Sequence, residues 1–252
     1  MCWSGEASAT VAVIGLGTTA YAAYRKEPAP LWAALGYFSL MEVLQAYTYL
    51  VIGECSSPAN QVATLLGYIH IAFQPIFGNA LFMHFIRPDV RQYIQAPVYI
   101  LCCISAVVML VQLYPFQWAG SCSAGTILCS QILCSVPGDW HIAWEIPYNA
   151  IGEITYDIPV LRAGFFTYTL TMFVLPILYG SWRITLYHIF LGPVPAYLLT
   201  NNLNEFAAVW CLVSIGFLLI VVKTPIRKFL YVKSWPLWPR HMDQRSLQTN
   251  LP

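Results

Sequence analysis

Residues 67–87, GYIHIAFQPIFGNALFMHFIR, decide the expected fold class, because they form one long apolar run in which only the last residue, Arg87, is permanently charged. A helix that crosses a membrane needs roughly 20 mostly apolar residues. The same run contains His70 and His84, whose imidazole groups are unusual in so apolar a stretch. We therefore predict a membrane-spanning helix here and ask what its histidines do.

The composition of the whole chain agrees with a membrane location. Hydrophobic residues make up 58% of the 252 residues and charged residues only 9%, whereas a soluble domain usually carries about 25% charged residues. We expect an integral, multi-pass membrane protein whose main partner is the lipid bilayer. The net charge of +1 argues against a nucleic-acid partner. The first residues, MCWSGEASAT, lack the basic region of a cleaved signal peptide.

Seven segments are long and apolar enough to be predicted as membrane spans. They lie at about 8–24, 31–52, 62–86, 96–114, 160–181, 184–200 and 206–222. The predicted fold class is all-α, an integral membrane bundle of seven transmembrane helices. Residues 1–222 would form the transmembrane domain, and residues 223–252 a basic, aromatic cytoplasmic tail.

The distribution of basic residues predicts an orientation for this bundle. Lys and Arg concentrate in cytoplasmic loops of membrane proteins. With seven spans, only Arg162 among the twelve Lys and Arg residues falls on the opposite side. The N-terminus is therefore expected outside and the C-terminus in the cytoplasm.

Five cysteines fall on the predicted outer side. Besides Cys2 they are the four disulfide candidates, Cys55 and, within a long loop at about 115–159, Cys122, Cys129 and Cys134. Disulfides persist in oxidising compartments, so two bridges are predicted, with all three pairings open. A metal site is the alternative, although C-x6-C-x4-C is not a usual zinc spacing.

Polar side chains inside the predicted spans are the candidate functional residues, because ionisable groups in a membrane usually face the bundle interior. We predict a polar pocket in the outer half of the bundle, for transport or sensing of a small ligand or ion, with Glu42 and His70 as its charged pair. A buried hydrogen-bond network that joins the helices predicted at 31–52 and 62–86 is the alternative. The predicted ligand-binding residues are Glu42, Gln45, His70, Gln74 and Glu205.

Two further hypotheses treat the histidines as ligands of a cofactor. The spacing of His70 and His84 would stack two axial ligands on one helix, as in b-type haem redox proteins of membranes. A His/carboxylate site with a divalent metal would instead give a metal-dependent membrane enzyme. The haem or metal candidates are His70, His84, His188 and His141. Enzymatic activity is left undecided, and a structural subunit bound to partners in a membrane complex is a third alternative.

Five short motifs resemble an uncharacterised family of small polytopic, seven-helix membrane proteins that open with Met-Cys-Trp-Ser. The motifs are MCWS (1–4), HIAFQP (70–75), WHIAWEIPYN (140–149), YGSWRITLYH (179–188) and NEFAAVWC (204–211). The resemblance spans nearly the whole chain. It implies a helical membrane fold, and no known activity is attached to the family.

Overall fold

The long helices of the N-terminal half begin where the sequence supplies a capping residue or a proline. The Ser4 hydroxyl accepts a hydrogen bond of 3.2 Å from the Ala7 amide and caps the first helix. Proline stands at the start of the next three, where its missing N–H loses no helical partner. The computed structural model describes residues 3–153 and 165–238. In it these helices are α1 (Gly5–Tyr24), α2 (Ala29–Thr48), α3 (Pro58–Phe82) and α4 (Pro88–Gln112).

The C-terminal half is built from shorter helices. Pro176 has no N–H to offer the carbonyl of Met172, four residues earlier, and the helix widens there into a π-helical turn. Gly192 leaves the helical conformation, and a new helix starts at Pro193. The pieces are α5 (Phe166–Thr169), the π-turn η4 (Leu170–Val174), α6 (Leu175–Leu178), α7 (Trp182–Leu191), α8 (Pro193–Leu199), α9 (Phe206–Lys223) and α10 (Ile226–Leu230).

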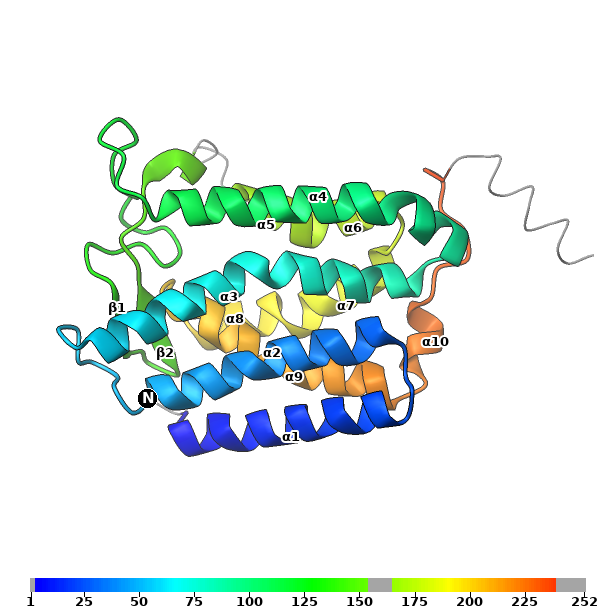
Figure 1. The fold of residues 1–252 in the computed structure, drawn as a ribbon, viewed down its shortest axis with the longest axis horizontal. Helices are drawn as coiled ribbons and strands as arrows, with labels where there is room; N and C mark the ends of the chain where they lie inside the picture. Colours follow the sequence, from blue (N-terminus) through cyan, green and yellow to red (C-terminus); the bar gives the residue numbers. More distant parts are fainter. Residues whose placement is uncertain (1–2, 154–164, 239–252) are drawn as a thin grey trace, which may run out of the picture.

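The long helices run side by side along the long axis of the molecule (Figure 1). α1 packs on α2, α2 packs on α3 and α9, and α3 packs on α4. The short 3-10 turn η1 (Met83–Phe85) follows α3, and a second one, η2 (Ala150–Glu153), follows the long loop after α4. The largest fully buried side chains of the helices form the centre of the core: Leu31, Leu35, Met41, Tyr68, Leu81, Phe82 and Met109.

An antiparallel hairpin of two strands, β1 (Cys134–Pro137) and β2 (Ile142–Glu145), lies at one end of the bundle (Figure 1). Trp144 of β2 packs on α3 at Gly67, where a Cβ would lie 3.4 Å from the indole ring. The Trp144 amide also donates a 2.8 Å hydrogen bond to the Asn204 carbonyl. The hairpin therefore joins α3 to the connection between α8 and α9.

The prediction of seven transmembrane helices is wrong. Among the described residues, two helices are long and apolar enough to cross a membrane: Pro58–Phe85, with a mean hydropathy of 1.3, and Pro88–Gln112, with 2.3. They correspond to the spans predicted at 62–86 and 96–114.

The other predicted spans fail for three physical reasons. α1 and α2 have 20 residues each, but Ala, Gly, Thr and polar side chains make them less apolar than a span requires. The π-turn and the break at Gly192 divide the segments predicted at 160–181 and 184–200, and the first of these also begins outside the described residues. The apolar part of α9, Phe206–Val221, is shorter than the required length.

The prediction of an all-α fold is also wrong, because β1 and β2 form a sheet. The predicted disulfides are present. They link Cys55 to Cys134, across 79 residues of sequence, and Cys122 to Cys129, across 7. Both bridges therefore involve the loop that carries the hairpin, and the first one ties β1 to the start of α3.

The segment after α9 folds back on the end of the bundle opposite the hairpin (Figure 1). The Val232 amide donates a hydrogen bond to the Phe85 carbonyl at 2.8 Å, and the Trp238 indole N–H donates one to the Tyr179 carbonyl at 2.9 Å. Gly180 has φ +102°, and a Cβ there would lie 2.9 Å from the Trp238 ring. The predicted tail thus packs on the helices as far as Trp238, and its remainder, 239–252, lies outside the described residues.

Candidate functional site

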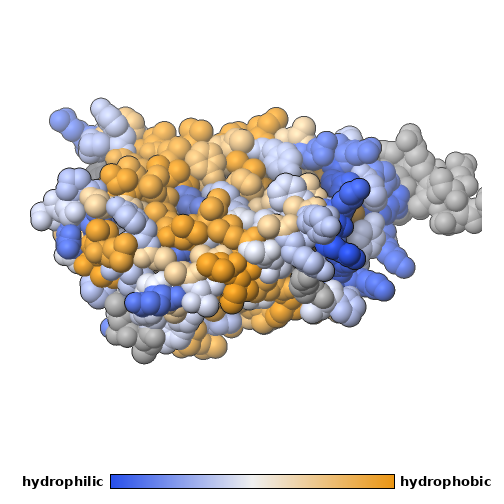
Figure 2. Space-filling model, turned by 60° about the horizontal axis from the view of Figure 1, so that its bottom comes forward, coloured by the Kyte–Doolittle hydropathy of each residue, from blue (hydrophilic) through white to orange (hydrophobic). Residues whose placement is uncertain are grey.

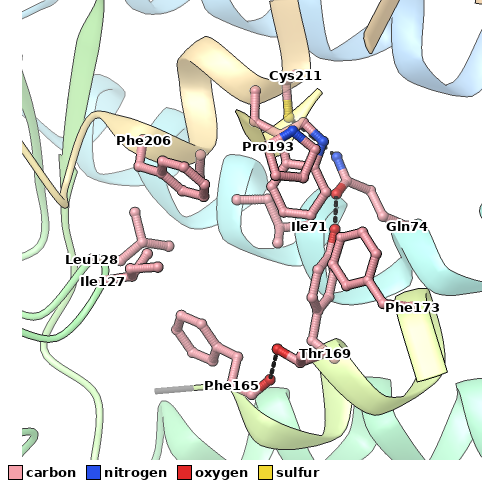
Figure 3. A pocket seen from close by; sticks show the side chains of 13 residues that line it. Ile71, Gln74, Ile127, Leu128, Phe165, Thr169, Phe173, Pro193, Phe206 and Cys211 are labelled. Atoms are coloured by element: carbon pink, nitrogen blue, oxygen red, sulfur yellow. Dashed lines mark hydrogen bonds between the residues drawn. The ribbon is translucent and has the colours of Figure 1, made fainter. Parts of the chain in front are cut away.

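A cavity of about 210 Å³ lies between α3, α5 with η4, and α9 (Figure 3). Its walls are almost entirely apolar, and six of the lining residues are aromatic rings or proline. Binding sites for small molecules typically combine such an apolar, concave surface with a few polar groups. The lining residues are Ile71, Gln74, Ile127, Leu128, Phe165, Tyr168, Thr169, Phe173, Pro193, Phe206, Ala207, Trp210 and Cys211.

The cavity lies where two helical segments are interrupted. The π-turn η4 contributes Phe173, and the start of α8 contributes Pro193. At the break before α8, a Cβ on Gly192 would lie 2.8 Å from the Trp210 indole nitrogen, so glycine is needed for Trp210 to lie against this break. π-turns inside helices occur frequently at functional sites. The irregular backbone therefore leaves space that two regular helices would have filled by close packing.

A disulfide-closed loop forms one wall of the cavity. Ile127 and Leu128 precede Cys129, which is bonded to Cys122, and Figure 3 shows their side chains across the cavity from Gln74 and Phe173. Leu128 has φ +66°, a conformation that L-residues with large side chains rarely adopt. Backbone strain of this kind persists only where the surroundings enforce it, and it is concentrated at functional sites.

The surroundings of Leu128 do enforce this conformation. Its carbonyl accepts a 2.9 Å hydrogen bond from the Ile146 amide, and the Ile127 carbonyl accepts one of 2.8 Å from the Tyr148 hydroxyl. The Leu128 side chain is only 1% exposed. The loop is thus held by backbone contacts to the segment after β2 as well as by its disulfide.

The polar groups of the cavity are on one wall. The Tyr168 hydroxyl donates a 2.7 Å hydrogen bond to the Gln74 carbonyl oxygen, and the Gln74 amide donates one of 3.2 Å to the Cys211 sulfur (Figure 3). All three side chains are buried. Of the five predicted ligand-binding residues, Gln74 is the one that lines this cavity.

Glu42 and Gln45 instead belong to a buried polar network beneath the hairpin. Both are fully buried, as is His141 in the hairpin turn. The Gln45 amide, oriented as a donor, lies 2.9 Å from a Glu42 oxygen and 3.0 Å from Nε2 of His141. The Tyr49 hydroxyl lies 2.8 Å from Nδ1 of the same ring. The network thus joins α2 to the hairpin turn.

Glu205 holds the hairpin turn from the other side. Its carboxylate accepts hydrogen bonds from the backbone amides of Trp140, at 2.6 Å, and of His141. The Thr200 hydroxyl donates to its other oxygen at 2.7 Å. A Cβ on Gly138 would lie 2.7 Å from the Glu205 carboxyl carbon, so glycine permits this close approach. Glu205 thus joins the hairpin turn to the start of α9, whereas the network predicted as an alternative would join the helices at 31–52 and 62–86.

The burial of His141 determines its protonation state. Burial lowers the pKa of its imidazole to about 3, because desolvation disfavours the charged ring. The ring is therefore neutral at physiological pH and can accept one hydrogen bond while it donates another.

His70 lies apart from this network. Its ring stacks on Tyr37 with the ring centroids 4.0 Å apart, and the Tyr37 hydroxyl donates a 2.6 Å hydrogen bond to the His70 carbonyl. In the described part of the chain, no hydrogen bond or ion pair joins His70 to Glu42. The structure thus does not bring together the charged pair expected from the sequence.

The remaining histidines have separate surroundings. Nε2 of His188 accepts a 3.1 Å hydrogen bond from the Trp210 indole, and the ring lies near those of Phe82 and Phe173. His84 lies against Phe85 in η1. Across residues 3–153 and 165–238, no group of three or more His, Cys, Asp or Glu is placed to hold a metal ion. The structure therefore offers no donor set for the metal hypothesis in this part of the chain.

Sequence reasoning missed most of the cavity lining. Phe165, Tyr168, Phe173 and Trp210 are hydrophobic residues in hydrophobic segments, so nothing in their local sequence separates a cavity wall from core or lipid contact. The available signal was the Gly192–Pro193 pair, which interrupts an apolar run.

Comparison with known proteins identifies a family without an activity. No curated protein matches the chain. No solved structure matches it. The model of the Family of unknown function (DUF5765) matches residues 6–231, which confirms the expected resemblance to an uncharacterised family and does not confirm a seven-helix description.

Proposed function

Since the chain belongs to the Family of unknown function (DUF5765), no activity can be carried over from the family, and we propose from the cavity that the protein binds a small apolar molecule between α3, α5 and α9. The observation that carries the proposal is the apolar, aromatic cavity of about 210 Å³ walled by a disulfide-held loop. Sites for drug-sized ligands have volumes of roughly 300–1,000 Å³. The ligand is therefore a smaller molecule, or the end of a longer one.

The burial of the lining residues suggests where the ligand enters. Phe173, Pro193 and Phe206 are partly exposed, whereas Gln74 and Cys211 on the inner wall are buried. The mouth of the cavity thus lies between the η4 segment and the α8–α9 segment. These segments have no extensive backbone packing against each other in the described residues. We infer that an apolar ligand enters through this side of the bundle.

We also propose that the protein is embedded in a lipid bilayer. Figure 2 shows a broad apolar band across the middle of the molecule and hydrophilic residues at its ends, most densely at the end near α10. Soluble monomers rarely expose contiguous apolar patches larger than a few hundred Å². Among the described residues, α3 with η1 and α4 are the helices long and apolar enough to cross it. Large exposed apolar side chains on α1, α2 and α4 include Val13, Ile14, Leu40, Val43, Ile100, Ile104 and Val107.

The ligand proposal is tested by photolabelling of the protein in lipid nanodiscs with a small alkyl diazirine. Labelled peptides are then mapped by mass spectrometry. We expect enrichment at Phe165–Phe173 and Phe206–Cys211 over the lipid-facing residues of α4. An even distribution over all exposed apolar segments would contradict the proposal.

A cavity-filling variant shows whether the labelling arises from the cavity. Ala207 lines the cavity and is 7% exposed, so Ala207→Phe should occupy the space and abolish the enrichment. Ala96→Phe is the matched control, because Ala96 is exposed on α4, away from the cavity. Enrichment that persists in Ala207→Phe would locate the probe elsewhere and overturn the proposal.

A further inference from the structure

The Gln74 amide has hydrogen-bonding capacity that the protein does not use. A glutamine side chain offers two N–H donors and a carbonyl oxygen with two lone pairs. In the structure it accepts one hydrogen bond, from Tyr168, and donates one, to Cys211. The side chain is 3% exposed and lines an apolar cavity, so water does not readily supply the missing partners.

The two bonds that Gln74 makes are unequal. The Tyr168 hydroxyl donates to its carbonyl oxygen at 2.7 Å, which is a normal length for a strong O–H···O bond. Its amide nitrogen donates to the thiol of Cys211, and a thiol sulfur is a weak acceptor. The Tyr168 bond also fixes which end of the amide faces Cys211. The unsatisfied side of Gln74 is therefore its N–H side, and its orientation is fixed.

The other N–H and O–H groups of the cavity wall are committed elsewhere. The Thr169 hydroxyl donates to the Phe165 carbonyl at 3.3 Å (Figure 3). The Trp210 indole N–H donates to His188 at 3.1 Å, and His188 does not line the cavity. Among the described lining residues, Gln74 is thus the side chain with a nitrogen-bound hydrogen left for a ligand.

We propose that the ligand is a small apolar carbonyl compound whose oxygen accepts a hydrogen bond from Gln74. This inference rests on the proposed ligand-binding function and adds the chemical class. The apolar walls would take the hydrocarbon skeleton, and the single free donor would take one acceptor oxygen. Gln74 then determines specificity, and Tyr168 is a positioning residue that holds the amide in place.

The test compares two probes with the same skeleton, camphor and bornane, which differ by one ketone oxygen. Each competes with the diazirine for labelling of the cavity peptides in nanodiscs, at matched concentrations in the lipid phase. One neutral hydrogen bond in a buried site corresponds to a preference of roughly fivefold to tenfold. We expect camphor to compete better than bornane by this factor.

Variants assign the preference to Gln74. Gln74→Leu should remove the preference for camphor while bornane still competes, and Gln95→Leu, at an exposed position of α4, should leave it unchanged. Should Gln74→Leu fail to fold, Gln74→Met gives a second measurement. Its unbranched side chain is similar in length but has no N–H donor, so it should likewise remove the preference for camphor.

The outcomes separate the two proposals. Equal competition by camphor and bornane at a labelled cavity would overturn the carbonyl inference and leave apolar binding intact. Labelled cavity peptides with which neither probe competes would overturn it as well. Absence of any cavity enrichment with the diazirine would refute the proposed function, and the carbonyl inference with it.

Discussion

At the scale of single residues, the buried polar side chains at the hairpin turn differ from the one that lines the cavity. Glu205 and His141 have their hydrogen-bonding atoms directed at partners in the protein, and they hold the hairpin turn on the helices. Gln74 has partners for only half of its capacity and faces a cavity. Buried polar groups with complete sets of partners are typical of structure, and an incomplete set in a cavity indicates a ligand.

The pKa of His141 predicts how stability depends on pH. Burial lowers this pKa from 6.5 to about 3, so between these values the unfolded chain binds a proton that the folded chain does not. The contribution of His141 to the free energy of unfolding is therefore complete above pH 6.5. It is lost as the pH falls towards 3, at up to about 1.4 kcal/mol per pH unit. Thermal unfolding at pH 7 and pH 5 should therefore show a fall in Tm.

The variant His141→Gln isolates this contribution, because its amide does not titrate. Its overall stability should be lower than that of the wild type, but its Tm should change less between pH 7 and pH 5. Glu42 and Glu205 are present in both proteins, so their effects largely cancel when the two proteins are compared. The same pH dependence in both proteins would show that protonation of His141 does not oppose folding.

At the scale of elements, interruptions of regular structure make the site. The π-turn η4 and the break at Gly192 separate segments that would otherwise pack closely, and the loop Cys122–Cys129 supplies the wall opposite Gln74. The prolines Pro176 and Pro193 account for both helix irregularities, because each lacks the N–H that would continue a helix. The Cys55–Cys134 bridge holds the hairpin on the end of the bundle, and the Cys122–Cys129 bridge closes the loop on itself.

The two disulfides should differ in their contribution to stability. In the chain-entropy model, a bridge stabilises more when it closes a longer loop. Loss of Cys55–Cys134, with a separation of 79 residues, should cost about 4–5 kcal/mol. Loss of Cys122–Cys129, with a separation of 7, should cost about 2–3 kcal/mol. Paired Cys→Ala variants and their free energies of unfolding test this order.

The main effect expected from loss of the Cys122–Cys129 bridge is weaker ligand binding. Removal of Cys122–Cys129 releases the loop that holds Ile127 and Leu128 against the cavity, so cavity photolabelling should fall in that double variant. Cys103→Ala is the control for loss of a cysteine, since Cys103 is a free, exposed thiol. A larger loss of stability from the shorter bridge would contradict the loop-length argument.

At the scale of the whole molecule, an apolar band lies between two hydrophilic ends that differ in character (Figure 2). The end with the hairpin carries both disulfides, which persist in oxidising compartments. The other end carries basic side chains, among them Arg227, which forms a 2.8 Å ion pair with Glu27. This asymmetry fits the proposed placement in a bilayer, with the hairpin end facing the oxidising side.

That placement predicts opposite accessibility of the two ends. In sealed cells, an impermeant maleimide should label a cysteine introduced at exposed Glu54, beside the hairpin, and should label Lys233→Cys only after permeabilisation. The protein should also stay in the membrane pellet at alkaline pH. Release into the supernatant, or equal labelling of both ends in sealed cells, would contradict a membrane-spanning placement.

The sequence by itself determined the positions of the long helices, the cysteines that pair, and one residue of the cavity. Helix length and apolarity are local properties, and the segments predicted at 8–24, 31–52, 62–86 and 96–114 overlap α1 to α4. Gln74 could be found because a polar side chain stands out in an apolar run. The number of spans was wrong, because a run of apolar letters does not show where a π-turn or a glycine divides the helix.

Only the tertiary structure decided which polar residues meet. Glu42 and His70 were expected together, but rotation of α2 and α3 about their axes depends on packing with α1, α9 and the hairpin. His141 comes to Glu42 and Gln45 from a loop about 100 residues away, as its separation of 92 from Tyr49 illustrates. The cavity is likewise made by five segments distant in sequence, because empty space is a property of how side chains pack and not of any one segment.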